Sequence, residues 1–149
     1  MLGISTTTVS NVINGKTSEV SQKTAEKVQK LLDEYDYVPN MNAKNLAQNH
    51  SRLIGIVLKR KKDKYDNIFT DPFHGELLGS LEAAIRERGY YMMLYTSEDI
   101  DEIVRNVVSW NTEGLILIGM LHDDYLKIRS KYKKPAVLID SYTPKNIAR

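Results

Sequence analysis

The chain has 149 residues, 42% of them hydrophobic and 27% charged, with a formal net charge of +2. This length suits one ordinary domain or one small and one medium domain, and the composition is typical of a soluble globular protein. The absence of cysteine excludes disulfides, thiolate metal sites and a cysteine nucleophile. No uncharged apolar run approaches the length of a membrane span, and the N-terminus lacks a signal-peptide pattern, so a cytoplasmic protein is expected.

The first predicted element is a short helix from Ser5 to Asn14. Ser5 is a suitable N-cap, because its hydroxyl can accept an amide proton of the first turn. Gly15 stands where helices commonly end in a left-handed residue. One arc of the helical wheel holds Thr6, Thr7, Ser10, Asn11 and Asn14, and the opposite arc holds Thr8, Val9, Val12 and Ile13. Short hydroxyl and amide side chains suit phosphates and base edges of DNA; the alternative is a plain surface helix rich in Ser and Thr.

A second helix is predicted from Ser21 to Tyr35, where apolar residues recur every three or four positions. Two short helices joined by a brief turn are typical of a DNA-binding helical hairpin. Two such helices cannot enclose a core by themselves. We therefore expect Met1 and Leu2 to be the end of an earlier helix, with the chain beginning in the middle of a domain.

Charge is distributed unevenly along the sequence. Residues 1–64 carry 11 Lys and Arg against 6 Asp and Glu, a net +5, whereas residues 65–149 carry 10 against 13, a net −3. This asymmetry favours an anionic partner for the N-terminal part, with nucleic acid first in line.

The Val38-Pro39-Asn40 segment breaks the helical pattern, because proline disfavours helix in the residue before it. Asn40 can cap a segment from Met41 to about Gln48. A helix of two turns is marginal in water, so we expect this segment to be disordered or to fold only on binding a partner.

From Ser51 onward, predicted strands alternate with predicted helices. The strands are Leu53–Leu58, Tyr90–Tyr95, Leu115–Ile118 and Ala136–Ile139, and the helices are Pro72–Arg88, Glu98–Trp110 with Ser97 as its cap, and Asp123–Tyr132. This alternation predicts an α/β fold with a parallel sheet and right-handed crossovers. The chain stops just after the fourth strand.

An α/β enzyme is the remote alternative for such a sheet. The turn after the first strand, Lys59-Arg60-Lys61-Lys62, lacks the glycines of a phosphate-binding loop. His50, His74 and His122 are scattered without metal-ligand spacing. The sequence therefore predicts no catalytic residue, no metal and no cofactor.

The motifs of the chain, taken in order, also point to a family. They are the opening segment 3–15, Val20-Ser21 with Thr24, Tyr37-Val38-Pro39-Asn40, Ala43-Lys44-Asn45-Leu46, Ile54-Gly55-Ile56, Asp71-Pro72-Phe73, Gly89-Tyr90, Gly114-Leu115-Ile116-Leu117 and Pro135-Ala136-Val137-Leu138-Ile139-Asp140. In order and spacing they resemble those of the LacI/GalR family of bacterial transcriptional repressors over nearly the whole chain. The opening helix is especially similar to that of the family's purine repressor.

The resemblance implies a partial helix-turn-helix that lacks its first helix (1–37), a hinge helix with its linker (38–50), and part of the N-terminal half of an effector module like periplasmic binding proteins (51–149). It implies a repressor that binds double-stranded operator DNA, by the opening helix in the major groove and by the hinge in the minor groove. It also implies a homodimer in the intact parent and a small-molecule effector such as a sugar or a purine.

The family's DNA-contacting positions fall on named residues of this chain. Thr6, Thr7 and Asn11 match base-reading positions, and Ser5, Thr8, Ser10 and Asn14 match positions that hold phosphates. Lys44 matches a usual Arg and keeps only the point charge, while Leu46 matches a leucine that wedges between base pairs; a plain packing leucine is the alternative. Many members carry Arg or His at Asn11. Asn pairs best with adenine and Arg with guanine.

The effector would lie beyond the carboxyl ends of the strands. Phe73, His74, Ser97 and Asp140 are the candidates for one wall of its cleft. An exposed residue at a helix start is an equally good interpretation of His74, and the Lys59–Lys64 run is interpreted as a solvated loop rather than a phosphate site.

The sequence departs from the family pattern at both ends, where the first helix and the second effector lobe have no counterpart. We therefore expect the chain as it stands to bind operator and effector weakly or not at all. A dimerising fragment that pairs with intact family members without reading DNA is the second functional hypothesis.

Overall fold

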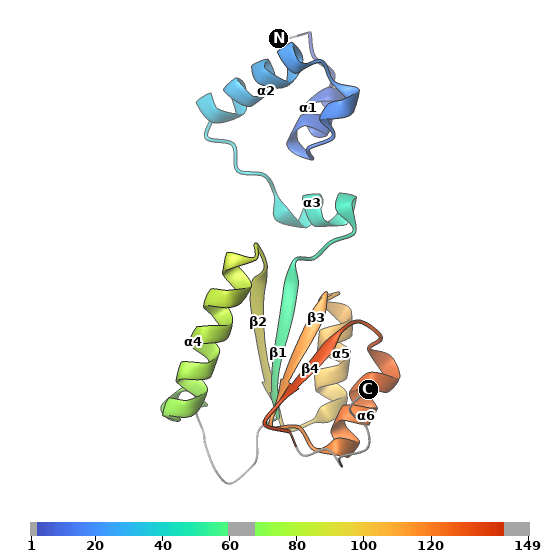
Figure 1. The fold of residues 1–149 in the computed structure, drawn as a ribbon. Coiled ribbons are helices and arrows are strands. Elements are labelled where there is room, and N and C mark those ends of the chain that lie inside the picture. Colours follow the sequence, from blue (N-terminus) through green and yellow to red (C-terminus); the bar gives the residue numbers. More distant parts are fainter. Residues whose placement is uncertain (1–2, 60–67, 142–149) are drawn as a thin grey trace. The chain divides into compact units, whose positions relative to one another are not determined.

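The protein is described by a computed structural model that covers residues 3–59 and 68–141. Its internal contacts divide the chain into two units, residues 1–50 and residues 51–149, and each unit is described by itself. The first unit contains α1 (Thr6–Ile13), the 3-10 helix η1 (Thr17–Glu19), α2 (Gln22–Glu34) and α3 (Met41–Gln48). The second unit contains β1 (Leu53–Lys59), η2 (Ile68–Thr70), α4 (Pro72–Glu87), β2 (Tyr91–Ser97), α5 (Ile100–Ser109), β3 (Gly114–Ile118), α6 (His122–Lys131) and β4 (Ala136–Ile139) (Figure 1).

The helices of the first unit begin at the predicted caps. The Ser5 hydroxyl accepts the amide proton of Thr8 at 3.1 Å, and Ser21 and Asn40 cap α2 and α3 in the same way. Gly15 has a φ of 72°, the left-handed conformation expected where α1 ends. The segment 41–48 is helical here, and its marginal stability in water stays a prediction.

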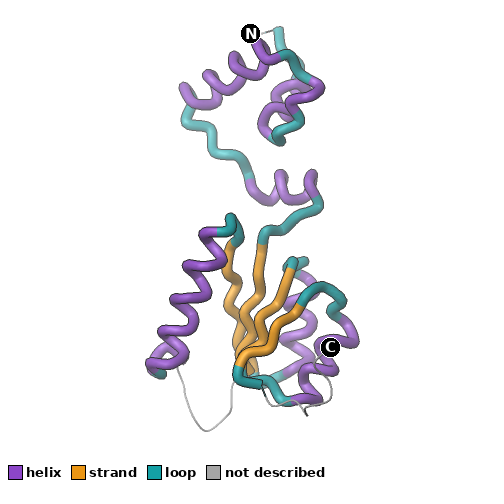
Figure 2. Tube along the Cα trace, viewed as in Figure 1, coloured by secondary structure: helices purple, strands orange, loops and turns teal. Residues whose placement is uncertain are grey.

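The second unit is an α/β layer structure, as the alternation of elements predicts. All three strand pairings are parallel and the strand order is β2-β1-β3-β4. Helix α4 covers one face of the sheet, and α5 and α6 cover the other (Figures 1 and 2). Side chains of β1 alternate between these layers, because successive residues of a strand point to opposite faces: Ile56 and Leu58 pack with α4, and Val57 packs with α5.

Two details of this unit differ from expectation. Helix α5 is capped by Asp99, whose side chain accepts the amide proton of Asp101, whereas Ser97 is the last residue of β2. Both residue types are good caps, but the Ser97 hydroxyl donates to the Glu102 side chain of α5 and accepts the amide proton of Asp99. Lys59 ends β1 rather than opening a loop, and its Nζ pairs with Asp124 at 2.6 Å; the rest of the predicted basic loop lies outside the described residues.

None of the described helices combines the length and apolar character that a membrane crossing requires.

Candidate nucleic-acid interface

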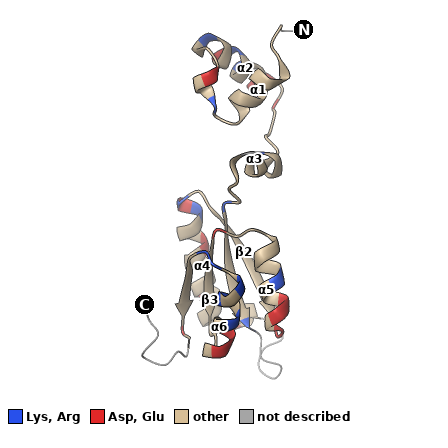
Figure 3. Cartoon of the chain, turned by 90° about the vertical axis from the view of Figure 1, so that its right-hand side faces the viewer, with Lys and Arg blue, Asp and Glu red and all other residues tan. Residues whose placement is uncertain are grey.

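Helix α1 presents a polar face without charge. Thr6, Thr7 and Ser10 are exposed, and Asn11 and Asn14 are half-buried. The helix contains no Lys, Arg, Asp or Glu and is uncoloured in the charge view, whereas α2 carries both signs (Figure 3). Because these side chains are short, a partner can approach the α1 backbone closely and exchange hydrogen bonds with it.

Two amides on this face are already oriented by neighbours. The Asn14 Nδ2 donates to the Ser10 hydroxyl at 3.2 Å, and the Asn11 Nδ2 donates to the Glu19 Oε2 at 3.0 Å. Glu19 was not among the residues singled out from sequence. Its position after the Gly15 turn is the one signal that could have placed it near Asn11.

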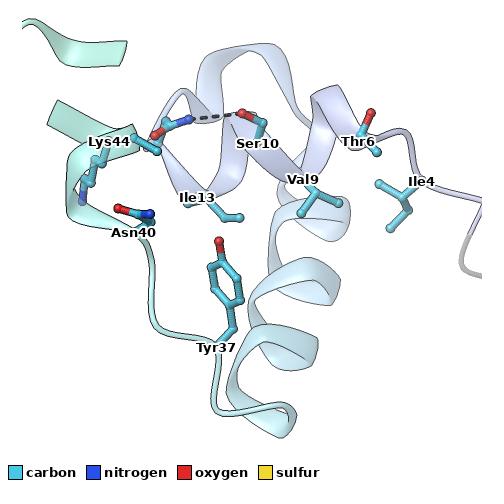
Figure 4. Close-up of a pocket in the computed structure, with 10 residues that line it drawn as sticks. Ile4, Thr6, Val9, Ser10, Ile13, Tyr37, Asn40 and Lys44 are labelled. Carbon is cyan, nitrogen blue, oxygen red and sulfur yellow. Dashed lines mark hydrogen bonds between the residues drawn. The ribbon is translucent and has the colours of Figure 1, made fainter. Parts of the chain in front are cut away.

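The apolar arc of α1 is only partly covered. Val9 and Ile13 are half-buried, and no residue of α1 is fully buried. They border a groove of about 470 Å³ that lies between α1 and α3. Its lining residues are Ile4, Thr6, Val9, Ser10, Ile13, Asn14, Tyr37, Asn40, Ala43 and Lys44. In Figure 4 the Tyr37 hydroxyl points toward Ile13, and both residues line this groove.

Helix α3 contributes the remaining predicted DNA-binding residues. Lys44 is half-buried at the rim of the groove, and Leu46 is 86% exposed. The Gln48 Nε2 donates to the carbonyl oxygen of Asn14 at 3.4 Å, a weak bond between the end of α3 and the end of α1. Because of its exposure, Leu46 makes little packing contact within this unit, and its role stays a prediction.

The positive charge expected for the N-terminal part does not belong to the first unit. Residues 3–50 carry five Lys against five Asp and Glu, a net charge of zero. The excess counted over residues 1–64 comes from Arg52, Lys59 and the basic run that follows, which belong to the second unit. DNA binding by the first unit is therefore supported by the uncharged face of α1 and by the position of Lys44 rather than by net charge.

Of the four candidate effector residues, two lie at the carboxyl ends of strands and two lie in the first turn of α4. Phe73 and His74 begin α4, which follows β1, and their rings meet edge to face at 5.6 Å. Ser97 ends β2 and Asp140 follows β4, and these two strands are the opposite edges of the sheet. A wall built from all four residues would thus span the width of the sheet.

These residues differ in how they are already bonded. Phe73 is 54% exposed and Asp140 is exposed with a φ of 47°, whereas the His74 Nδ1 lies 3.0 Å from the Asp71 carboxylate. Ser97 is buried, and its hydroxyl donates to the Glu102 Oε2 at 2.5 Å. Of the four, Phe73 and Asp140 are the most accessible to a ligand.

The Glu102 carboxylate joins β2 to α5. It accepts a hydrogen bond from the Tyr95 hydroxyl at 2.6 Å, and Asn106 in turn donates to that hydroxyl at 2.8 Å. The hydrogen bond to Glu102 raises the pKa of Tyr95 above its usual value, and burial adds to the rise. This network holds Ser97 in place, and sequence reasoning missed it because its members are spread over two elements.

Comparison with known proteins adds to this geometry. The family described as bacterial regulatory proteins, lacI family, matches residues 2–40. The ribose operon repressor of Escherichia coli K12 is 32% identical over 146 residues, which are 94% of this chain and 42% of that protein. The chain spans about two fifths of the length of the curated relatives that it matches.

Two solved structures are similar to this one. The lac repressor dimer bound to operator and the anti-inducer ONPF has a TM-score of 0.76 at 24% identity, over 94% of this chain and 42% of that chain, which supports the fold. The transcriptional regulator CelR in its cellobiose complex has a TM-score of 0.51 at 26% identity, over 91% of this chain and 39% of that chain. The ribose operon repressor and CelR are transcriptional regulators, which favours a regulator over the α/β enzyme. From its matched N-terminal residues, its parallel sheet and these similarities, the chain belongs to the LacI family of bacterial regulatory proteins.

Proposed function

We propose that this chain belongs to a sequence-specific transcriptional regulator in which α1 reads operator DNA in the major groove. The observation that carries the proposal is the exposed, uncharged face of a capped helix that lies within the family match at residues 2–40. Thr6, Thr7 and Asn11 are the proposed base-reading residues. Ser5, Thr8, Ser10 and Asn14 are proposed to hold phosphates, because hydroxyl and amide side chains bond phosphate oxygens without specifying sequence.

Helix α3 is the proposed minor-groove element. Leu46 is exposed enough to insert between base pairs, where partial unstacking costs a few kcal/mol and is offset by closer contact with bent DNA. Lys44 supplies a positive charge for a phosphate. The homodimer is part of this proposal, because two hinge helices in one minor groove require two protomers.

The second unit is proposed to bind a small-molecule effector, a sugar or a purine, beyond the carboxyl ends of its strands. Phe73 can stack on an apolar ring face, and Asp140 can accept hydrogen bonds from ligand hydroxyls or amines. His74 and Ser97 are the other two proposed residues of this wall. The cellobiose bound to the similar regulator CelR supports a sugar-class ligand.

Weak operator affinity is also expected for the chain as it stands. Val9 and Ile13, on the apolar side of α1, are only half-buried and border a groove, so α1 is incompletely supported.

Selection from a random duplex library, using the full chain, tests the DNA role. Fluorescence anisotropy then compares the selected duplex with a scrambled duplex of the same composition at two salt concentrations. The proposal expects tighter binding to the selected duplex at both concentrations. Equal binding to both duplexes would contradict base reading by α1 in this chain. It would favour the dimerising hypothesis, which size-exclusion chromatography of the chain mixed with a full-length relative tests.

A further inference from the structure

The contact between Asn11 and Glu19 links the centre of the α1 polar face to the turn that follows the helix. The Asn11 Nδ2 donates to the Glu19 Oε2 at 3.0 Å, and the Asn11 carbonyl oxygen accepts the amide proton of Lys16 at 2.8 Å. Glu19 ends η1, and the left-handed Gly15 lets the chain turn back between them. Asn11 is therefore held at its backbone and at its side chain by the same turn.

The hydrogen bond between Asn11 and Glu19 distinguishes the two flipped orientations of the Asn11 amide. A side-chain amide has one acceptor oxygen and two N–H donors, whereas a carboxylate only accepts. Rotating the Asn11 amide by 180° would place its oxygen against the Glu19 carboxylate, acceptor against acceptor. Glu19 thus favours the orientation in which Nδ2 faces it, leaving one N–H and the carbonyl oxygen for a partner.

This remaining set matches one base. Adenine presents an acceptor at N7 and a donor at N6 in the major groove, which one donor and one acceptor complement. Guanine presents two acceptors there and would need two donors. An Asn11 amide free to rotate would distinguish the two bases less well.

We propose that Glu19 is a specificity-determining positioning residue that orients Asn11 to read adenine. The inference rests on the proposed function, because it assigns Asn11 to a base. Because a carboxylate repels the phosphates of bound DNA, neutralising Glu19 is expected to lower base discrimination without lowering overall affinity. A merely structural glutamate would, when replaced, weaken binding to all sequences alike.

The test is Glu19→Gln in the full chain, with Ser18→Ala on the same exposed turn as the matched control. Glutamine keeps the shape but can donate or accept, so both orientations of Asn11 become available. Affinities are measured for four duplexes that differ only at the base pair whose preference Asn11→Ala removes. We expect a roughly tenfold preference for adenine in the wild type and in Ser18→Ala. In Glu19→Gln the preference falls to about threefold or less, with equal or tighter binding overall.

A second measurement needs no DNA. The two Nδ2 protons of Asn11 give separate signals in ¹⁵N-correlated NMR spectra, and these should shift in Glu19→Gln but not in Ser18→Ala. Unchanged signals, a tenfold preference kept by Glu19→Gln, or an equal loss of affinity on all four duplexes would each overturn the inference and leave the proposed function standing. A wild-type chain with no base preference sensitive to Asn11→Ala would overturn both.

Discussion

The two units of the chain use their side chains in opposite ways. In the second unit, buried side chains fill both faces of a four-stranded sheet, with Ile56 and Leu117 fully enclosed. In the first unit, Val28 is the one buried hydrophobic residue among residues 3–46 and 48–50. Burial of apolar surface is the main stabilising term in folding. The second unit therefore has a core of its own, whereas the first buries much less apolar surface.

This difference in apolar burial suggests that the second unit provides most of the stability, whereas the first unit keeps its side chains accessible for recognition. Helices of eight to thirteen residues are marginal unless they bury an apolar face. The first unit leaves Val9, Ile13 and Leu46 partly or fully accessible. It is therefore expected to gain order from a partner, whereas the sheet is expected to be ordered without one.

The largest expected effect is on the core of the second unit. Leu117→Ala should lower the free energy of unfolding of this unit by about 2–5 kcal/mol, because it leaves a cavity between the sheet and α5. Urea unfolding followed by circular dichroism measures the change. Val137→Ala, on the exposed side of β4, is the control and should change stability by less than about 0.5 kcal/mol. A similar cost for both variants would show that this core is not the source of stability.

Asn11→Ala should act on recognition and leave folding unchanged. It should relax the preference at one base pair by about 1–3 kcal/mol, measured as relative affinities for duplexes substituted at each position. Gln29→Ala on exposed α2 is the control and should leave every preference intact. An equal loss on every duplex after Asn11→Ala would count against a base-reading role.

Tyr132→Phe probes a polar contact inside the stable unit. The Tyr132 hydroxyl donates to the Thr112 carbonyl oxygen at 2.9 Å in a buried site, and its loss should cost about 1 kcal/mol. Tyr91→Phe, on an exposed ring, is the control and should cost nothing measurable.

The same residue predicts a pH dependence. Burial raises the pKa of Tyr132 above its ordinary value of 10.0. The folded state therefore holds the phenol proton more tightly than the unfolded chain. This contribution is complete below pH 10 and is lost as the pH rises through the higher pKa of the folded state. The difference in unfolding free energy between wild type and Tyr132→Phe should shrink at alkaline pH, and a constant difference would contradict this account.

Lys44→Ala should give the smallest effect. If Lys44 meets a phosphate, its loss weakens binding to all duplexes alike and lowers the slope of log affinity against log salt by about 1. Lys30→Ala on α2 is the matched charge control. A change in base preference, or a salt slope altered equally by both variants, would argue against the assignment.

Local chemistry made much of this architecture predictable from sequence. The helix starts are indicated by the capping residues Ser5, Ser21 and Asn40. The continuous apolar run at Leu53–Leu58 indicates a strand that is buried on both faces. The parallel sheet follows from alternation, and the strand order β2-β1-β3-β4 does not, because it depends on which crossovers pack.

Side-chain contacts between different elements could not be predicted from the sequence pattern. Ser97 and Asp99 are equally good caps, and the bond from Ser97 to Glu102 decides that the strand continues. Glu19 reaches Asn11 only because a left-handed turn brings it back. The positive excess counted over residues 1–64 gave a wrong expectation for a related reason: the boundary between the units falls after residue 50, where contacts and not composition divide the chain.

Hydrogen–deuterium exchange of the full chain, read by mass spectrometry with and without DNA, tests the central claim most directly. Without DNA, the amides of β1 and β3 should exchange slowly and those of α1 and α3 quickly. The selected duplex should slow exchange in α1 and α3 and leave the strands unchanged, and the scrambled duplex should do neither. Equal protection of both units without DNA, or the same response to both duplexes, would contradict the account.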